Sequence, residues 1–282
     1  MWTEQNLQSC NSCQINSQRE DEAIEIEPAK VFLIGSILRF DILSNLTAKR
    51  APLLSEQYQQ ILQTPRYDIS LESVLGCRNW LLITLLNVYS LRDWKENTKM
   101  IESLSMWELM RKAQEIKQSL ESNITLNLED MNKHKQELKD GGDGDGELRH
   151  SKYDIPVVTH IFACAVSILL EVVVSGALPK LPEIKNEMSR AIESYAYINN
   201  PDLLYVLRWP LYVAGCLAGP EHHDFFRGLL TSPNTTRFGS FQESLQLLEE
   251  CWQLSTDVGI NDAGSEMTAV YKFLTRGDVL IA

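Results

Sequence analysis

The most apolar stretch of the chain, Ile155–Val174, reads IPVVTHIFACAVSILLEVVV and decides how the whole sequence is interpreted. Gly176 and Pro179 follow it, and both residues commonly end a helix. The overlapping run Ile161–Leu178, 18 residues with Glu171 as its one charge, also has the length of a membrane span. Four polar residues nevertheless recur at helical spacing and form one narrow stripe: His160, Ser167, Glu171 and Ser175. Since a carboxylate at the centre of a span costs about 2.5 to 3.5 kcal/mol, the pattern favours a buried core helix with one polar edge and no membrane contact.

Helical periodicity precedes this stretch. Apolar residues recur every three or four positions over 31–46 and again over 71–91, which predicts two helices. Ser105 and Glu108 then form a capping box, in which each side chain satisfies a free backbone donor of the other residue, and a third helix follows. Residues 127–152 lose the apolar stripe and include alternating glycine and acidic residues. We therefore expect a flexible, acidic, glycine-rich internal loop at 127–152.

Helix signals also follow the apolar stretch. Pro182 and Pro201 each stand where a helix is expected to begin, and Pro210 is expected to bend the second of these helices. Later signals are a second capping box and a last apolar stripe, at Ser240–Glu243 and 263–274. The sequence contains no convincing alternating strand pattern and no glycine-rich phosphate loop. It predicts an all-α protein that forms an irregular multi-helix domain.

Composition and charge limit the organisation and the partners. Residues 1–30 are polar and then acidic, with almost no apolar periodicity, which predicts a disordered acidic arm. Residues 31–282 are expected to form one α-helical domain that contains the 127–152 loop. The 282 residues carry 26 basic and 38 acidic side chains, a net charge of -12. Because the sequence has no basic cluster, we expect no direct contact with DNA by this chain.

One group of residues suggests metal chemistry. His222, His223 and Asp224 resemble the adjacent His and Asp that hold a divalent ion in helical metal-dependent phosphohydrolases. Such a site also needs a distant His and Asp, and His160 and Asp257 would have to supply them, although no motif marks either residue. The competing interpretation is a polar helix start, with Asp224 favoured near the positive end of the helix. We expect no catalytic, cofactor-binding or metal-binding residues, and keep a helical metal-dependent hydrolase as the alternative function.

The six cysteines give little support for a metal site or for disulfides. Cys10 and Cys13 are half of a zinc site without the other two ligands. The other four lie in apolar patterns, where a free thiol behaves as a small hydrophobic side chain: Cys77, Cys164, Cys216 and Cys251. This usage fits a reducing compartment.

Several blocks, in their order along the chain, resemble the fungal-specific transcription factor domain. This domain is the regulatory region that lies C-terminal to the binuclear zinc cluster in many fungal activators. The blocks are Phe40-Asp41-Ile42-Leu43-Ser44, Leu75-Gly76-Cys77, Leu91-Arg92-Asp93-Trp94-Lys95 and the segment from Leu207 to Cys216 that contains Trp209-Pro210. The resemblance covers about 31–282, and its overall pattern is most similar to the acriflavine-sensitivity-control subgroup.

This resemblance implies an α-helical scaffold in a nuclear regulator of transcription, often one that governs a metabolic or secondary-metabolite gene set. It implies no catalytic residues. Trp94 and Trp252 are expected to fill the core, and Gly215 to allow close packing of helices. Six clustered cysteines are not visible, so we expect action through protein partners of the transcription machinery or through a zinc-cluster homologue. An upstream exon that encodes the cluster is the other possibility. A small-molecule effector pocket between helices is a further expectation, with no residue assigned.

Overall fold

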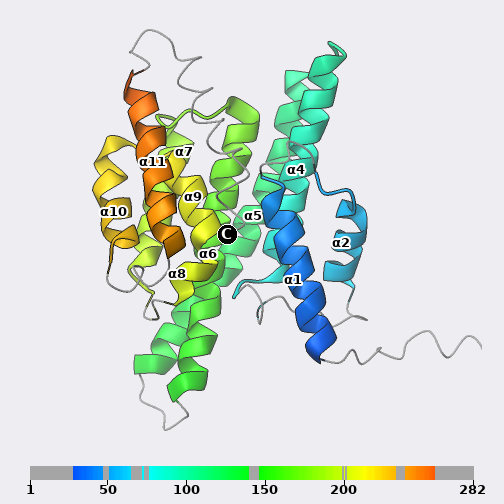
Figure 1. Ribbon diagram of the computed structural model, residues 1–282. Coiled ribbons are helices and arrows are strands. Elements are labelled where there is room, and N and C mark those ends of the chain that lie inside the picture. Colours follow the sequence, from blue (N-terminus) through cyan, green and yellow to red (C-terminus); the bar gives the residue numbers. More distant parts are fainter. Residues whose placement is uncertain are drawn as a thin grey trace, which may run out of the picture.

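The computed structural model describes residues 28–46, 51–64, 72, 76–139, 146–198, 200, 202–232 and 239–257. Every element within these ranges is a helix, and the described part contains no strand (Figure 1). In chain order the helices are α1 (Pro28–Ser44), α2 (Ser55–Gln63), α4 (Asn79–Met100), α5 (Met106–Lys139), α6 (Gly146–Ser175), α7 (Pro182–Tyr195), α8 (Leu203–Val206), α9 (Arg208–Cys216), α10 (Pro220–Leu230) and α11 (Gly239–Asp257). The predicted all-α class is confirmed.

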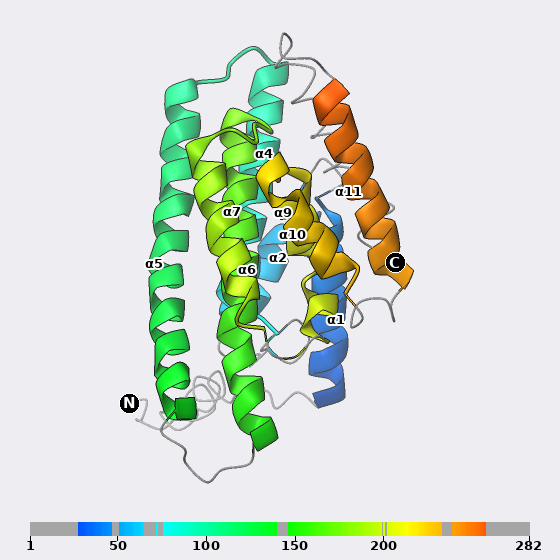
Figure 2. The ribbon, with the colours of Figure 1, turned by 90° about the vertical axis from the view of Figure 1, so that its left-hand side faces the viewer.

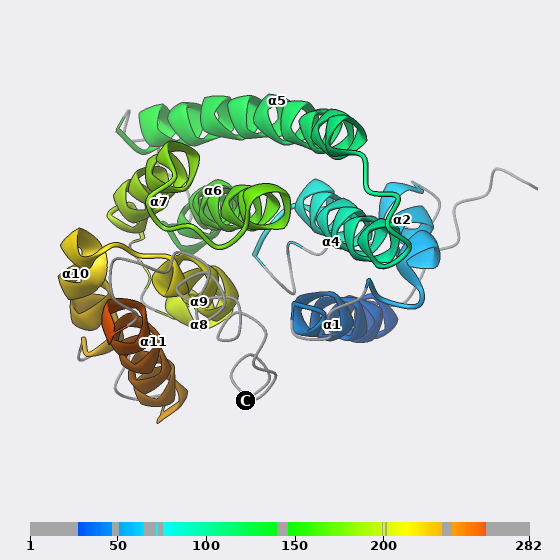
Figure 3. The same ribbon diagram turned by 90° about the horizontal axis from the view of Figure 1, so that it is seen from above.

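The helices pack in layers around α6. Helix α6 contacts α4, α5, α7 and α9. Seen from above, α5 forms one outer layer, and α1, α9 and α11 lie on the opposite side of α4 and α6 (Figure 3). Helices α5 and α6 run antiparallel as a long pair (Figure 2). Buried side chains from α1 through α11 join in one hydrophobic cluster.

The apolar stretch that opened the sequence forms the centre of this arrangement. Asp154–Ser175 is long and apolar enough to cross a membrane, but 89% of its most apolar window is buried inside the protein. The charged residue of its polar edge is paired, because Nζ of Lys117 on α5 lies 2.7 Å from Oε1 of Glu171. This bond raises the pKa of Lys117. The predicted core helix with one polar edge is confirmed.

The predicted loop at 127–152 is wrong in its bounds. Helix α5 continues to Lys139 and α6 begins at Gly146, so most of the expected loop is helical, and 140–145 lie outside the described residues. The reason is a contact that a local pattern does not reveal. The side chain of Asn127, which is buried, donates a hydrogen bond of 2.8 Å to the carbonyl oxygen of Pro156. This bond joins the two helices beyond the apolar stripe.

Other helix bounds also differ from the predictions. The helix expected over 71–91 is displaced, since α4 runs from Asn79 to Met100 and is preceded by Gly76 at a positive φ of 64°. The helix that was expected to bend at Pro210 is interrupted instead. Helix α8 ends at Val206 and α9 begins at Arg208, with Leu207 between them. Pro210 lies in the first turn of α9, where its missing N–H costs no helical bond. The start of α7 at Pro182 is confirmed. The helix expected over 263–274 lies outside the described residues, as does the arm before Pro28.

Candidate functional site

The residues that suggested a metal site are engaged in packing at the start of α10. The ring of His223 stacks on the indole of Trp252, with centroids 3.9 Å apart, and its Nε2 lies 3.1 Å from the carbonyl oxygen of Ala218. Burial lowers the pKa of His223. Asp224 accepts a hydrogen bond of 2.9 Å from Nη1 of Arg227 and keeps its side chain 94% exposed. These contacts brace α10 against α11.

The other proposed ligands do not complete a site. His222 lies beside His223 on α10, whereas His160 is buried on α6. Asp257 is the last residue of α11, and its side chain is outside the described part. Among the residues that the structure describes, no three His, Cys, Asp or Glu side chains are grouped to hold a metal ion. The described residues therefore give no support to the hydrolase alternative, which required such a convergence.

The block Leu91–Lys95 on α4 is a joint between helices. Nζ of Lys95 donates to the carbonyl oxygens of Val173, at 2.6 Å, and Val174, near the C-terminal end of α6. These carbonyls belong to the last turn, where helix oxygens have no partner within the helix. Trp94, predicted as a core filler, is only partly buried, and Nζ of Lys112 on α5 lies 5.2 Å from its ring centroid. The Trp-Lys pair therefore binds α4 to both α5 and α6.

Arg92 and Asp93 of the same block hold the chain that follows α1. Arg92 is buried and donates 3.1 Å and 3.3 Å bonds to the carbonyl oxygens of Asn45 and Leu46. Asp93 accepts a hydrogen bond from the backbone N–H of Ala51. Both ends of the segment that connects α1 to α2 are thus fixed to α4 by charged side chains, which make stronger bonds than neutral groups.

The block from Leu207 to Cys216 packs against α11. Trp252 is buried, as predicted, and its indole Nε1 donates a hydrogen bond of 2.8 Å to the carbonyl oxygen of Gly215. A Cβ added at Gly215 would lie 2.7 Å from Cδ1 of Leu248. The close approach of helices predicted at Gly215 is confirmed. On the other side of α9, the ring of Trp209 stacks on Phe162 of α6 at 5.9 Å.

A buried polar group lies between α6 and α7. Glu187 accepts a 2.7 Å bond from Nη1 of Arg190, and burial raises the pKa of Glu187. Burial lowers the pKa of His160 to about 4 and raises the pKa of the Cys164 thiol. The thiol is therefore protonated and has the environment of an inert structural cysteine.

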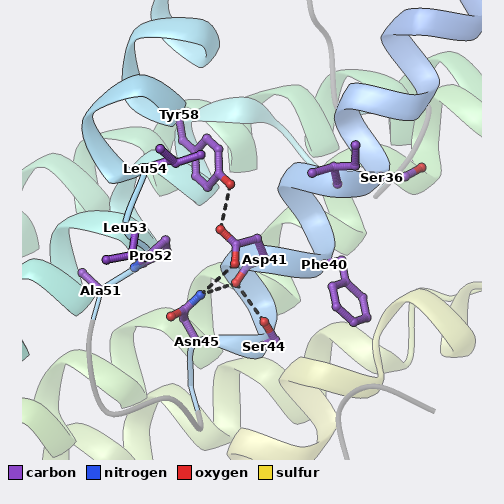
Figure 4. A pocket seen from close by; sticks show the side chains of 11 residues that line it. Ser36, Phe40, Asp41, Ser44, Asn45, Ala51, Pro52, Leu53, Leu54 and Tyr58 are labelled. Carbon is purple, nitrogen blue, oxygen red and sulfur yellow. Dashed lines mark hydrogen bonds between the residues drawn. The ribbon is translucent and has the colours of Figure 1, made fainter.

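A cavity of about 870 Å³ lies between α1 and α2 (Figure 4). One wall comes from α1, with Ile37, Phe40 and Asp41, and the other from Leu53, Leu54 and Tyr58. Its volume falls in the usual range of about 300 to 1,000 Å³ for small-molecule sites, which are mostly apolar with a few polar groups. The wall on α1 contains part of the Phe40–Ser44 block.

The polar groups of the cavity are arranged around Asp41. The hydroxyl of Tyr58 donates a 2.7 Å bond to Oδ2 of Asp41, and burial together with this bond raises the pKa of Tyr58 to about 12. The side-chain amide of Asn45 donates to the backbone oxygen of Asp41, and its distance to Oδ1 is 3.4 Å. Among the described residues, Oδ1 therefore has only this long contact, and Tyr58 stays neutral at physiological pH.

Sequence reasoning assigned no residue to this cavity. It did not predict α2, the nine-residue helix that supplies Tyr58. A signal was present, since Leu54, Tyr58 and Leu62 recur at four-residue spacing, as on one helix face. The pairing of Tyr58 with Asp41, 17 positions earlier, depends on tertiary packing.

Within the described residues the structure is thus a helical scaffold with fixed joints between its helices and one largely apolar cavity that contains a carboxylate. The chain belongs to the family of the fungal specific transcription factor domain, which it matches over residues 5–263. The family is one of transcription factors, so the chain is not an enzyme. The membership predicted from the sequence blocks is confirmed; the acriflavine-sensitivity-control subgroup stays a prediction.

Relatives of the chain are fungal regulators. It is 48% identical over 256 residues to transcription factor ntnD of a Nectria species, covering 91% of this chain and 42% of that protein. It is 30% identical to a trichothecene biosynthesis transcription regulator of Fusarium sporotrichioides, covering 79% of this chain and 48% of the relative. The ustiloxin B cluster transcription factor ustR of Aspergillus flavus is 25% identical, with coverages of 76% and 36%. The chain thus spans less than half the length of these relatives, and no solved structure matches it.

Proposed function

We propose that the chain forms the regulatory scaffold of a transcriptional regulator that controls a secondary-metabolite gene set from the nucleus. The observation that carries this proposal is the family match over residues 5–263. Two relatives support the finer part, since their names assign them to trichothecene biosynthesis and to the ustiloxin B cluster. The helical joints described above would hold the scaffold in one shape, as a surface for partners requires.

The proposed scaffold acts through proteins rather than through DNA. The net charge of -12 disfavours binding to a phosphate backbone and favours binding to a basic protein partner. A zinc-cluster homologue has this chemistry, because basic residues lie between its cysteines. DNA reading is then assigned to that homologue, or to a zinc cluster encoded by an upstream exon; sequencing the 5′ end of the transcript distinguishes the two.

An apolar surface at the corner between α4 and α5 supports a protein contact. The corner patch consists of large exposed side chains: Met100, Ile101, Met106, Trp107 and Met110. Trp107 is 75% exposed. Contiguous apolar side chains of this kind mark interaction sites, Trp is enriched among residues that dominate binding energy, and Met adapts to a partner's shape. We assign to this patch an apolar contact with the basic partner.

The test of the proposed function uses the chain in its host. Deleting the gene should lower transcripts of one gene set, and restoring the wild-type gene should recover them. Trp107→Glu should fail to recover them at unchanged protein abundance and nuclear fluorescence of a tagged chain. Leu126→Glu changes another exposed apolar residue of α5 and serves as the matched control, because Leu126 is 58% exposed and outside the patch.

Two results would contradict the proposal. Unchanged transcript levels after deletion, under conditions in which the gene is expressed, would remove the regulatory role. Full recovery of the transcripts by Trp107→Glu would contradict the role of the corner patch but not the regulatory role of the chain. A gel shift at physiological salt should show no specific DNA complex with the purified chain, and a specific complex would overturn the assignment of DNA reading to other residues.

A further inference from the structure

We propose that the cavity between α1 and α2 binds a protonated amine that carries an apolar body, with the carboxylate of Asp41 as the counter-ion. The inference rests on the geometry of this cavity and not on the transcriptional role. It assigns a ligand class and an anchoring residue to a site for which neither the family nor the relatives' names provide one.

The apolar part of the ligand is set by the walls. Ile37 and Phe40 on α1 are 55% and 57% exposed, and Leu53 and Leu54 on the facing segment are 82% and 50% exposed. These four side chains line one cavity, so a bound apolar group would remove surface of both walls from water together, at roughly 25 cal/mol per Å² of buried area. An aromatic ring also has Phe40 as a partner within the site.

The charge of the ligand is set by Asp41. Oδ2 of Asp41 accepts a hydrogen bond of 2.7 Å from the Tyr58 hydroxyl, whereas within the described part of the chain Oδ1 has only the 3.4 Å contact to Asn45. Of the described residues that line the cavity, none is basic. A carboxylate among apolar side chains gains most from a cationic donor, because Coulomb attraction between opposite charges adds to the hydrogen bond that a neutral donor would also make. The same carboxylate and the net charge of -12 disfavour an anionic ligand.

The walls are held in place, which favours binding. Arg92 fixes the carbonyl oxygens of Asn45 and Leu46, and Asp93 fixes the N–H of Ala51. The segment that forms the wall opposite α1 is thereby attached to α4 near its start. A ligand pays less ordering entropy when it enters a site whose walls are already fixed.

Three matched probes test the ligand class on the purified full chain. They share one phenylbutyl body and differ in the head group: 4-phenylbutylamine, 4-phenylbutanol and 4-phenylbutyrate. Titration calorimetry at pH 7 should give a dissociation constant for the amine about tenfold below that of the alcohol. The carboxylate should bind more weakly than both. Backbone NMR shifts should change for residues of α1 and for 51–58.

Two variants locate the site. Asp41→Asn keeps the size of the side chain and an acceptor for Tyr58 but removes the charge, and it should make the amine and the alcohol bind equally. Asp224→Asn makes the same change at an exposed carboxylate on α10 and should leave the tenfold preference intact. Circular dichroism confirms that each variant is folded before titration.

Each remaining outcome overturns the proposal. Equal binding of the three probes to the wild-type chain would mean that the walls bind apolar groups without selection by charge. An amine preference that survives Asp41→Asn would place the amine elsewhere on the acidic surface. Absence of binding by the folded chain would remove the site. None of these results bears on transcript levels after gene deletion, so they are distinguishable from a failure of the proposed function.

Discussion

Replacing Gly215 by alanine should destabilise the protein, because the backbone of α9 lies close to Leu248 of α11 there. A Cβ at this position would lie 2.7 Å and 2.8 Å from the two Cδ atoms of Leu248, while carbon atoms in contact prefer about 3.5 to 4.0 Å. Leu248 is 1% exposed, so its side chain cannot turn into solvent. Overpacking of this kind costs about 1 to 3 kcal/mol.

Gly228 provides the matched control for helix propensity. It lies in α10, and a Cβ there meets nothing within 4 Å. Alanine should therefore stabilise at this position by about 0.5 to 1 kcal/mol, since it forms helix better than glycine. The same gain accompanies Gly215→Ala and partly offsets its cost. The difference between the two variants, about 1 to 3 kcal/mol, isolates the contact with Leu248.

The assay is urea unfolding followed by circular dichroism, with thermal melting as a second measure. At about 2 to 4 °C per kcal/mol for a chain of this size, Gly215→Ala should melt several degrees below Gly228→Ala. In a Leu248→Ala background, which removes the clashing atoms, Gly215→Ala should become neutral or stabilising. Equal melting temperatures of the two alanine variants, or an undiminished cost without the Leu248 side chain, would refute the reasoning.

Three further outcomes follow from single contacts. Lys95→Met removes the donor to the last carbonyls of α6 and should cost about 1 to 3 kcal/mol in urea unfolding, whereas Lys99→Met, at an exposed position of α4, should change little. Burial lowers the pKa of His160 from 6.5 to about 4, so the folded protein holds this side chain neutral. The free energy of unfolding should therefore fall by up to about 3 kcal/mol as the pH falls from 6.5 to 4. His160→Leu should make the free energy of unfolding less dependent on pH over that window, and an unchanged pH dependence would contradict the reasoning. Trp252→Phe removes the bond to Gly215 and should lower stability by about 1 kcal/mol in thermal melting.

The parts of the fold that the sequence predicted are those specified locally. Pro182 begins α7 because its fixed φ suits a first helical turn. The backbone N–H of Glu108 donates a hydrogen bond of 3.3 Å to Oγ of Ser105, which is the predicted cap of α5. Helix α6 was predicted from its composition, because a helix that is apolar on all sides but one narrow edge is stable in water only when it is buried in a core.

The parts that the sequence did not predict depend on contacts between distant residues. The end of α5 looks polar because much of it faces solvent, and its buried Asn127 bonds to Pro156 of the next helix. The Asp224 carboxylate suggested metal binding, but its partner Arg227 also bonds Glu249 of α11. The residue types were read correctly in both cases. Their partners follow from tertiary packing, which neither periodicity nor motif spacing specifies.

The block Leu91–Lys95 on α4 contacts both the wall of the cavity and the core helix α6. Arg92 and Asp93 hold the segment beside the cavity, while Lys95, one turn along the same helix, holds the end of the core helix α6. Helix α4 also packs directly against α6. Because protein interiors are close-packed, these bonds keep the cavity wall in place only while α4 keeps its packing on α6. The block Leu91–Lys95 is therefore the described part of the chain that makes the shape of the cavity depend on the core.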